Sequence, residues 1–201
     1  MKTNVSMLKA LLGPILIGIP FITANANVLQ YDAFLDGPSE SPPNGSPATG
    51  FADVFYDNVA HTLVVEVSFS GLLGTTTASH IHAATAAPGV GTAGVAKTTP
   101  FFAGFPIGVT SGSYSNTLDL TSSSSYNAAY ITANGGTTAG AEAALALAMA
   151  DGEAYLNIHT TVVPGGEIRG FLTLVPEPSG AALLGLGAAI FAWAGRRRAA
   201  V

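Results

Sequence analysis

Residues 61–69 read His-Thr-Leu-Val-Val-Glu-Val-Ser-Phe, and this stretch decides the fold class. Its alternate positions are apolar: Leu63, Val65, Val67 and Phe69. The positions between them include the polar Thr62, Glu66 and Ser68. Since side chains alternate between the two faces of a strand, a period of two predicts a strand with one face against a core.

Similar short runs recur along the chain and are separated by turn-forming residues. Asp57-Asn58 and Pro164-Gly165-Gly166 are the clearest turn signals. The runs are Val28–Leu35, Thr49–Tyr56, Ser79–Ala83, Ser113–Leu120, Glu153–Thr160 and Glu167–Leu174. With 61–69 they make seven short strands, which predict an all-β domain, an antiparallel sandwich or barrel.

Two segments depart from this pattern. Ala139–Ala150 is rich in alanine and leucine and stops at Asp151-Gly152, so we expect one short helix there. Thr121–Ser125 is a low-complexity run of threonine and serine, and we expect a loop.

Composition excludes several classes of protein. Charged residues make up 9% of the 201 residues, against about 25% in an ordinary soluble domain. Residues 27–174 hold two basic and eleven acidic side chains, a net charge of −9, so we expect no nucleic-acid partner. The absence of cysteine excludes a disulfide scaffold and thiolate metal ligands.

The N-terminus predicts export. Lys2 and Lys9 precede an apolar run from Ala10 to Ile22, and Ala24 and Ala26 supply small residues at the −3 and −1 positions of a cleavage site. This is typical of a secretory signal peptide over residues 1–26, which would engage the Sec translocon and signal peptidase. An uncleaved membrane anchor is the alternative.

The C-terminus, residues 175–201, carries a second address. It contains Pro176-Glu177-Pro178, an apolar stretch from Gly180 to Gly195, and the basic cluster Arg196, Arg197 and Arg198. The triplet, the transmembrane helix and the arginines resemble the PEP-CTERM sorting signal of Gram-negative bacteria. The resemblance implies an exosortase substrate. Such a protein is associated with the inner membrane during sorting and then lies at the cell surface or in the extracellular polymer matrix. An ordinary tail anchor is the alternative.

Polar residues recur on one face of the later strands. In His80-Ile81-His82 both imidazoles fall on the same face, opposite Ile81. In the run 155–159 the polar residues Asn157 and His159 alternate with leucine and isoleucine, and Glu167 and Arg169 flank Ile168. Because the aliphatic residues should face the core, we expect the histidines on the other face, beneath a loop.

The same residues resemble the CHRD domain, which is named for chordin and occurs in exported bacterial proteins. The resemblance covers nearly all of residues 27–174, and its closing motif includes Asn157, Gly165, Gly166, Glu167, Arg169 and Gly170. The upstream segments that match are Pro42-Pro43, Ala48–Gly50, Ser70–Leu72 and His80–Ala83. The resemblance implies a β-sandwich domain and leaves the activity open.

The histidines allow two interpretations. Three neutral imidazoles at His80, His82 and His159 suit zinc or copper, with Glu167 as a fourth ligand or as the partner that fixes a tautomer. The His-x-His strand is also similar to the copper-binding strand of Cu,Zn superoxide dismutase. However, the further ligands and the disulfide of that enzyme are missing.

The alternative is structural: the imidazoles would bond to loop backbone, and Arg169 would pair with Glu167, Glu153 or Glu66. We expect this role first, and no catalytic residue, because the chain has neither a nucleophile elbow nor a phosphate-binding loop. The sequence therefore predicts an exported, surface-sorted, non-catalytic structural or binding component of the cell envelope or polymer matrix. A metal-binding domain or metalloenzyme is the alternative.

Overall fold

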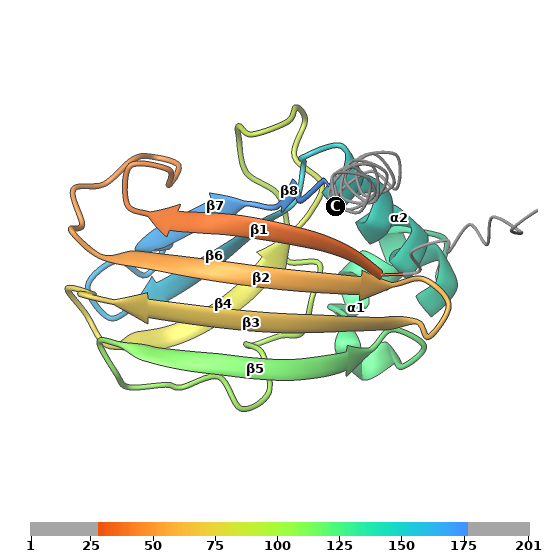
Figure 1. The fold of residues 1–201 in the computed structure, drawn as a ribbon, viewed down its shortest axis with the longest axis horizontal. Coiled ribbons are helices and arrows are strands. Elements are labelled where there is room, and N and C mark those ends of the chain that lie inside the picture. The colour runs from red at the N-terminus through yellow and green to blue at the C-terminus, as the bar shows by residue number, and fades with distance from the viewer. Residues whose placement is uncertain (1–27, 177–201) are drawn as a thin grey trace, which may run out of the picture.

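The computed structural model describes residues 28–176, which form a β domain with helices at one end (Figure 1). The strands are β1 (Val28–Asp36), β2 (Thr49–Asp57), β3 (Thr62–Ser70), β4 (Thr76–His82), β5 (Gly112–Asp119), β6 (Tyr155–Thr160), β7 (Ile168–Phe171) and β8 (Thr173–Leu174). The helices are α1 (Ala128–Ala133), α2 (Thr138–Ala150) and a 3-10 turn at Ser123–Ser125. The predicted signal peptide and most of the predicted sorting signal, from Glu177 onward, lie outside the described residues.

The strands form one antiparallel sheet in the order β4-β6-β7-β1-β2-β3-β5, and β8 also pairs with β1. The sheet curls over: β1, β2, β3 and β5 make one half, and β7, β6 and β4 lie behind them (Figure 1). The expected all-β antiparallel class is confirmed. Its two layers are halves of a single sheet joined where β1 meets β7.

The inner surfaces of the two halves enclose the core. On β3 the four alternate apolar residues predicted from the sequence are all buried. Ile81, Leu156 and Ile168 from the other half have no exposed surface. The period of two therefore correctly predicts which side of each of these strands faces inward.

Helix α2 covers one end of the curled sheet (Figure 1). It begins after Thr137, whose side chain accepts a hydrogen bond from the amide of Gly140, and it buries Leu145 and Met149. Gly152, just beyond it, has a φ of 70°, which a side chain would strain. The predicted helix over 139–150 is confirmed.

Two short elements were not expected. Helix α1 was missed, and Ser123–Ser125, predicted as loop, forms a 3-10 turn. Both are too short to show helical periodicity, and α1 depends on a local cap, the Asn127 side chain that accepts from the amide of Ala129. Within the described residues neither α1 nor α2 has the length and apolar content needed to span a bilayer.

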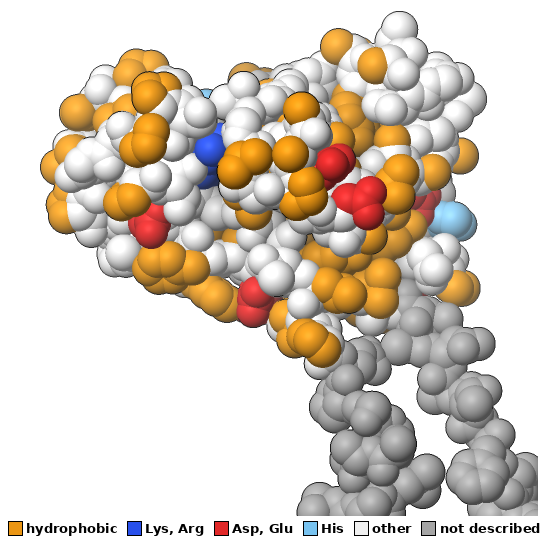
Figure 2. Space-filling model, turned by 90° about the horizontal axis from the view of Figure 1, so that it is seen from above, with side chains coloured by type: hydrophobic (Ala, Val, Ile, Leu, Met, Phe, Trp, Pro, Cys, Tyr) orange, Lys and Arg blue, Asp and Glu red, His pale blue; other side chains and the backbone are white. Residues whose placement is uncertain are grey.

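On the surface, the acidic side chains of the body are spread out. On the face seen in Figure 2 they lie at separate places among apolar and uncharged side chains. The net negative charge of the body therefore does not gather into one strongly charged patch on this face.

Candidate metal site

The outer face of β4 and β6 carries the histidines. Ile81 lies in the core, so its neighbours His80 and His82 point to the opposite face. The register pairs His80 with Asn157 and Ala78 with His159, which brings imidazoles from both strands to one place.

Loops cover this face, as the sequence predicted for the histidines. His80 and His82 are buried, and His159 is half-buried. His82 Nδ1 donates to the backbone oxygen of Ala93 over 2.9 Å, and His80 Nε2 contacts the backbone oxygen of Pro100. Both partners belong to the long connection between β4 and β5. His159 Nδ1 donates over 2.8 Å to the backbone oxygen in the turn before β7, at Pro164.

These contacts fix the tautomer of each ring. A carbonyl oxygen only accepts, so the ring nitrogen that faces it must carry the hydrogen. A neutral imidazole has one N–H, which leaves a lone pair on the other nitrogen. Those remaining atoms are His80 Nδ1, His82 Nε2 and His159 Nε2, and none of the three has a hydrogen-bond partner among the described residues.

Burial keeps the rings neutral. It lowers the pKa of His80 to about 4, against the partial compensation of the bond to Pro100. Burial likewise lowers the pKa values of His82 and His159. At neutral pH all three rings therefore hold a free lone pair, which is the form of histidine that binds metal ions.

The three rings are close enough to share an ion. One nitrogen from each lies within 4.8 Å of the other two. Three such atoms lie within about 2.8 Å of a common point, and zinc–imidazole bonds are about 2.0–2.1 Å. Side-chain shifts of under about 1 Å would close the site. Orphaned buried acceptors of this chemistry fit zinc or copper.

Glu167 does not belong to the cluster, contrary to the expectation that it supplies a ligand or fixes a tautomer. Its carboxylate accepts hydrogen bonds of 2.6–3.3 Å, and it is fully buried. The donors are Ser46 Oγ, Thr160 Oγ1 and the amides of Leu73 and Gly74. Burial alone would raise its pKa, but these four bonds outweigh burial and lower the pKa. Glu167 therefore links three connections to the end of β6.

Arg169 also has partners other than those expected. Its guanidinium lies 3.8 Å from the carboxylate of Glu40, not against Glu167, Glu153 or Glu66. It donates to the backbone oxygen of Gly91 over 2.9 Å and to that of Ser39. Arg169 thus ties two covering loops to β7, and burial raises the pKa of its partner Glu40 to about 7 despite the nearby positive charge.

A stack of side chains joins Arg169 to the histidines. The Tyr155 ring lies parallel to the His82 ring, with centroids 4.8 Å apart. The Arg169 guanidinium lies over the same Tyr155 ring, 4.7 Å from its centre. This packing holds the His82 ring in a single orientation.

The glycines of the closing motif differ in their roles. A Cβ on Gly166 would meet Glu40 Oε1 at 2.5 Å, and its φ is 129°. A Cβ on Gly170 would meet the backbone oxygen of Phe34 at 2.3 Å. Gly165 faces open space. Gly166 and Gly170 are therefore fixed by close approach of neighbouring groups, and Gly165 by nothing comparable in its surroundings.

A second group of titratable residues was not foreseen. Lys97 is fully buried, with Nζ 3.9 Å from the centre of the Tyr126 ring, and burial lowers its pKa to about 7. Glu142 accepts from Tyr56 and contacts His61 Nδ1 at 3.0 Å. The period-two pattern gave no signal for Lys97, because it lies outside the predicted strands.

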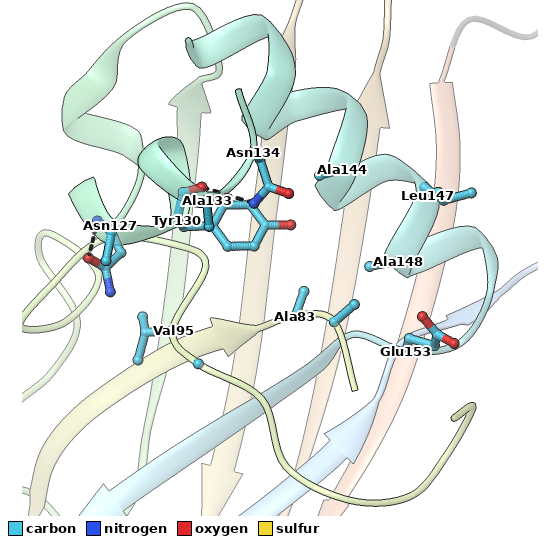
Figure 3. A pocket seen from close by; sticks show the side chains of 13 residues that line it. Ala83, Val95, Asn127, Tyr130, Ala133, Asn134, Ala144, Leu147, Ala148 and Glu153 are labelled. Carbon is cyan, nitrogen blue, oxygen red and sulfur yellow. Dashed lines mark hydrogen bonds between the residues drawn. The ribbon is translucent and has the colours of Figure 1, made fainter. Parts of the chain in front are cut away.

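A hollow of about 520 Å³ opens at the helical end, between α1, α2 and the chain after β4 (Figure 3). Alanines from all three segments line it, with Tyr130, Leu147 and Glu153 at its margins. Its other polar groups are Asn127 and Asn134, and Glu153 is its one carboxylate, so the lining holds no pair of acidic and basic side chains. The three imidazoles that could share an ion lie elsewhere, on the outer face of β4 and β6.

Fold and site together define a class: a curled antiparallel β domain that buries a histidine cluster beneath loops on its outer face. The family model of the CHRD domain matches residues 31–172, so the chain belongs to the CHRD domain family. No curated protein and no solved structure matches the chain.

Proposed function

We propose that this protein is an exported, surface-sorted CHRD domain protein that binds one zinc or copper ion through His80, His82 and His159. The observation that carries the metal site is the set of three buried ring nitrogens without partners, each opposite a nitrogen that donates to a backbone carbonyl. Backbone bonds of this kind orient the imidazoles of metal sites.

A purely structural role explains only one of the two nitrogens of each imidazole. It explains the three bonds to loop carbonyls and leaves three buried acceptors unsatisfied, at about 1–3 kcal/mol each. A bound cation satisfies all three at once. For this reason we place metal binding ahead of structural stapling.

The chain's own groups would do the following. The loop carbonyls hold the rings in the reactive tautomer, and the Tyr155 stack fixes His82. His159 is the half-buried member of the cluster, and we propose that an ion enters from its side. A bound ion would act as a Lewis acid or, for copper, as an electron carrier. No described group beside it acts as a nucleophile in our proposal, and we assign a binding role.

The deciding experiment is metal analysis of the exported protein, purified without a histidine tag. We expect close to one zinc or copper ion per chain. The triple variant H80A/H82A/H159A should lose it, and His61→Ala, which removes the histidine beside Glu142, should keep it. Absence of metal from the unaltered protein, with a heat-sensitive triple variant, would make the histidines structural staples.

The export part of the proposal rests on the sequence of the two ends. The signal peptide would deliver the domain through the Sec translocon, and an exosortase-type enzyme would cut near Pro176-Glu177-Pro178. The released domain would then lie at the cell surface or in the polymer matrix. Replacing Arg196, Arg197 and Arg198 with glutamine should leave the protein in the membrane fraction unprocessed. Unchanged processing would overturn the sorting assignment.

A further inference from the structure

Asn157 lies beside the three histidines on the same face of the β4–β6 pair. The register places Asn157 directly opposite His80, and His159 lies two residues further along the same strand face. His82 is two residues from His80, hence diagonal to Asn157. Direct, diagonal and i±2 neighbours on one face of an antiparallel pair are all within reach of one another. Asn157 is therefore the position adjacent to all three rings.

The side chain of Asn157 is nearly inaccessible, with 2% of its surface exposed. Its Oδ1 atom is buried and has no hydrogen-bond partner among residues 28–176. An unsatisfied amide oxygen in the interior costs about 1–3 kcal/mol. The strands around it are β4, β6 and β7. The Ser79 hydroxyl lies on the opposite face and donates to the backbone oxygen of Asn157, not to its side chain.

The imidazoles beside this oxygen do not supply a hydrogen, because each ring N–H faces a backbone carbonyl. His82 lies diagonal to Asn157 on the same face of the β4–β6 pair. The ring N–H of His82 is committed to the backbone oxygen of Ala93. The other ring nitrogen carries a lone pair, so His82 Nε2 and Asn157 Oδ1 are two buried acceptors, without donors in the described part of the chain, on neighbouring positions of one face. Only a cation, or an amide turned to present its NH2 group, makes that arrangement favourable.

We propose that Asn157 Oδ1 is the fourth ligand of the ion, so that the site holds it with three nitrogens and one amide oxygen. This inference rests on the proposed metal binding and extends it to a residue that simple metal-ligand patterns omit. All four ligands are neutral, and four is the coordination number of protein zinc sites.

The oxygen also sets the kind of ion. Amide oxygen is a hard donor, whereas monovalent copper prefers soft sulfur ligands and imidazoles. A site with Asn157 as ligand therefore favours a divalent ion, zinc or Cu(II), over Cu(I). Without the oxygen, three imidazoles form a trigonal set that no longer makes this distinction.

The test compares two substitutions that keep the shape of the side chain. Asn157→Leu removes the oxygen, and Asn157→Asp keeps an oxygen and adds a charge. Asn116→Leu is the matched control, since Asn116 lies on β5 and makes only an exposed bond to the backbone of Ala103. The readouts are the visible absorption of bound Co(II), which reports the number of ligands, and zinc affinity by competition with a chelator.

We expect Asn157→Leu to bind zinc at least tenfold more weakly and to change the Co(II) spectrum. Asn157→Asp should bind zinc at least as tightly as the unaltered protein, also with a changed spectrum, and Asn116→Leu should match the unaltered protein in both. An unchanged affinity and spectrum in Asn157→Leu would overturn the inference while leaving the three-histidine site intact. If Asn157→Leu does not fold, the Asp variant decides: an unchanged spectrum there is equally contrary. Failure of the unaltered protein to bind either ion would overturn the proposed function itself.

Discussion

On β2 and β3 the outward side chains meet solvent, whereas on β4, β6 and β7 most outward side chains are buried beneath loops. Glu66 and Ser68 on β3 are exposed, and so is Phe51 on β2. On the other half His80, Asn157 and Arg169 are as inaccessible as core residues. Both halves alternate with a period of two. The alternation distinguishes the inner face of a strand from its outer face. The connections between strands decide whether the outer face is exposed to solvent.

The buried polar face must satisfy its polar groups within the protein, whereas the exposed face can use water. Polar groups that leave water must find partners inside the protein. Glu167 and Arg169 find theirs in loop amides and carbonyls, and the histidines find one each. One nitrogen of each of the three rings lies within 4.8 Å of the other two. The covered half therefore carries the candidate site, and the exposed half supplies the natural controls.

The largest effect should come from removing the carboxylate under the loops. Glu167→Ala leaves four hydrogen-bond donors without an acceptor. We expect a loss of about 3–5 kcal/mol in the free energy of unfolding, because each buried unsatisfied group costs about 1–3 kcal/mol. Chemical denaturation measures it. Glu66→Ala, which removes an exposed carboxylate of the other half, should change stability by less than about 0.5 kcal/mol. Equal losses in the two variants would erase the distinction between the halves.

The next effect concerns pH. Folded His80 has a pKa of about 4 against an ordinary 6.5, so below pH 6.5 the unfolded chain binds a proton that the folded chain refuses. The metal-free protein should lose about 3 kcal/mol from this group as pH falls from 6.5 to 4. Glu40 works in the opposite direction, since its raised pKa means that its contribution declines as pH rises from 4.5 to 7.

The variant His80→Gln isolates the histidine contribution, because Glu40 is present in both proteins. The difference in unfolding free energy between the protein and the variant should shrink as pH falls through this window. If the unfolding free energies of the two proteins changed in parallel with pH, His80 would not be held neutral by burial. Its side chain would then be solvent-exposed, like the outer face of β3.

A smaller effect should follow metal addition. An ion supplied at a hundred times its dissociation constant stabilises the folded state by about 2.7 kcal/mol, which corresponds to a rise of about 5–10 °C in Tm for a chain of this size. Differential scanning fluorimetry with zinc measures the shift. His159→Ala should abolish it and His61→Ala should retain it. An equal shift in both variants would locate metal binding away from the covered face.

The smallest effect belongs to the exposed half. Phe34 and Phe51 pair across β1 and β2 and are 59% and 41% exposed. Phe51→Thr should cost no more than about 1 kcal/mol, the usual value of a cross-strand pair, and leave metal content unchanged. A change in metal content after this substitution would mean that the two outer faces are coupled through the core.

Sequence alone predicted a strand at each of β1 to β7, while the last predicted run, Glu167–Leu174, is divided in the structure into β7 and β8. The alternation at 61–69 and around Ile81, Leu156 and Ile168 predicted which of these residues enter the core, because neighbouring side chains on a strand point to opposite sides. The same rule placed His80 and His82 together, and the closing motif pointed to the family. The family match over residues 31–172 agrees with that.

Only the tertiary structure decided what lies on the covered face. The register of β4 on β6 brings His159 and Asn157 to the His80–His82 pair, and register depends on pairings between residues about 80 positions apart. The loops that bury this face supply the carbonyls that fix the tautomers, and they bind Glu167 and Arg169 to partners that spacing along the chain does not reveal. Short-range periodicity reports how each strand divides its two faces. Which polar groups then meet is set by long-range packing.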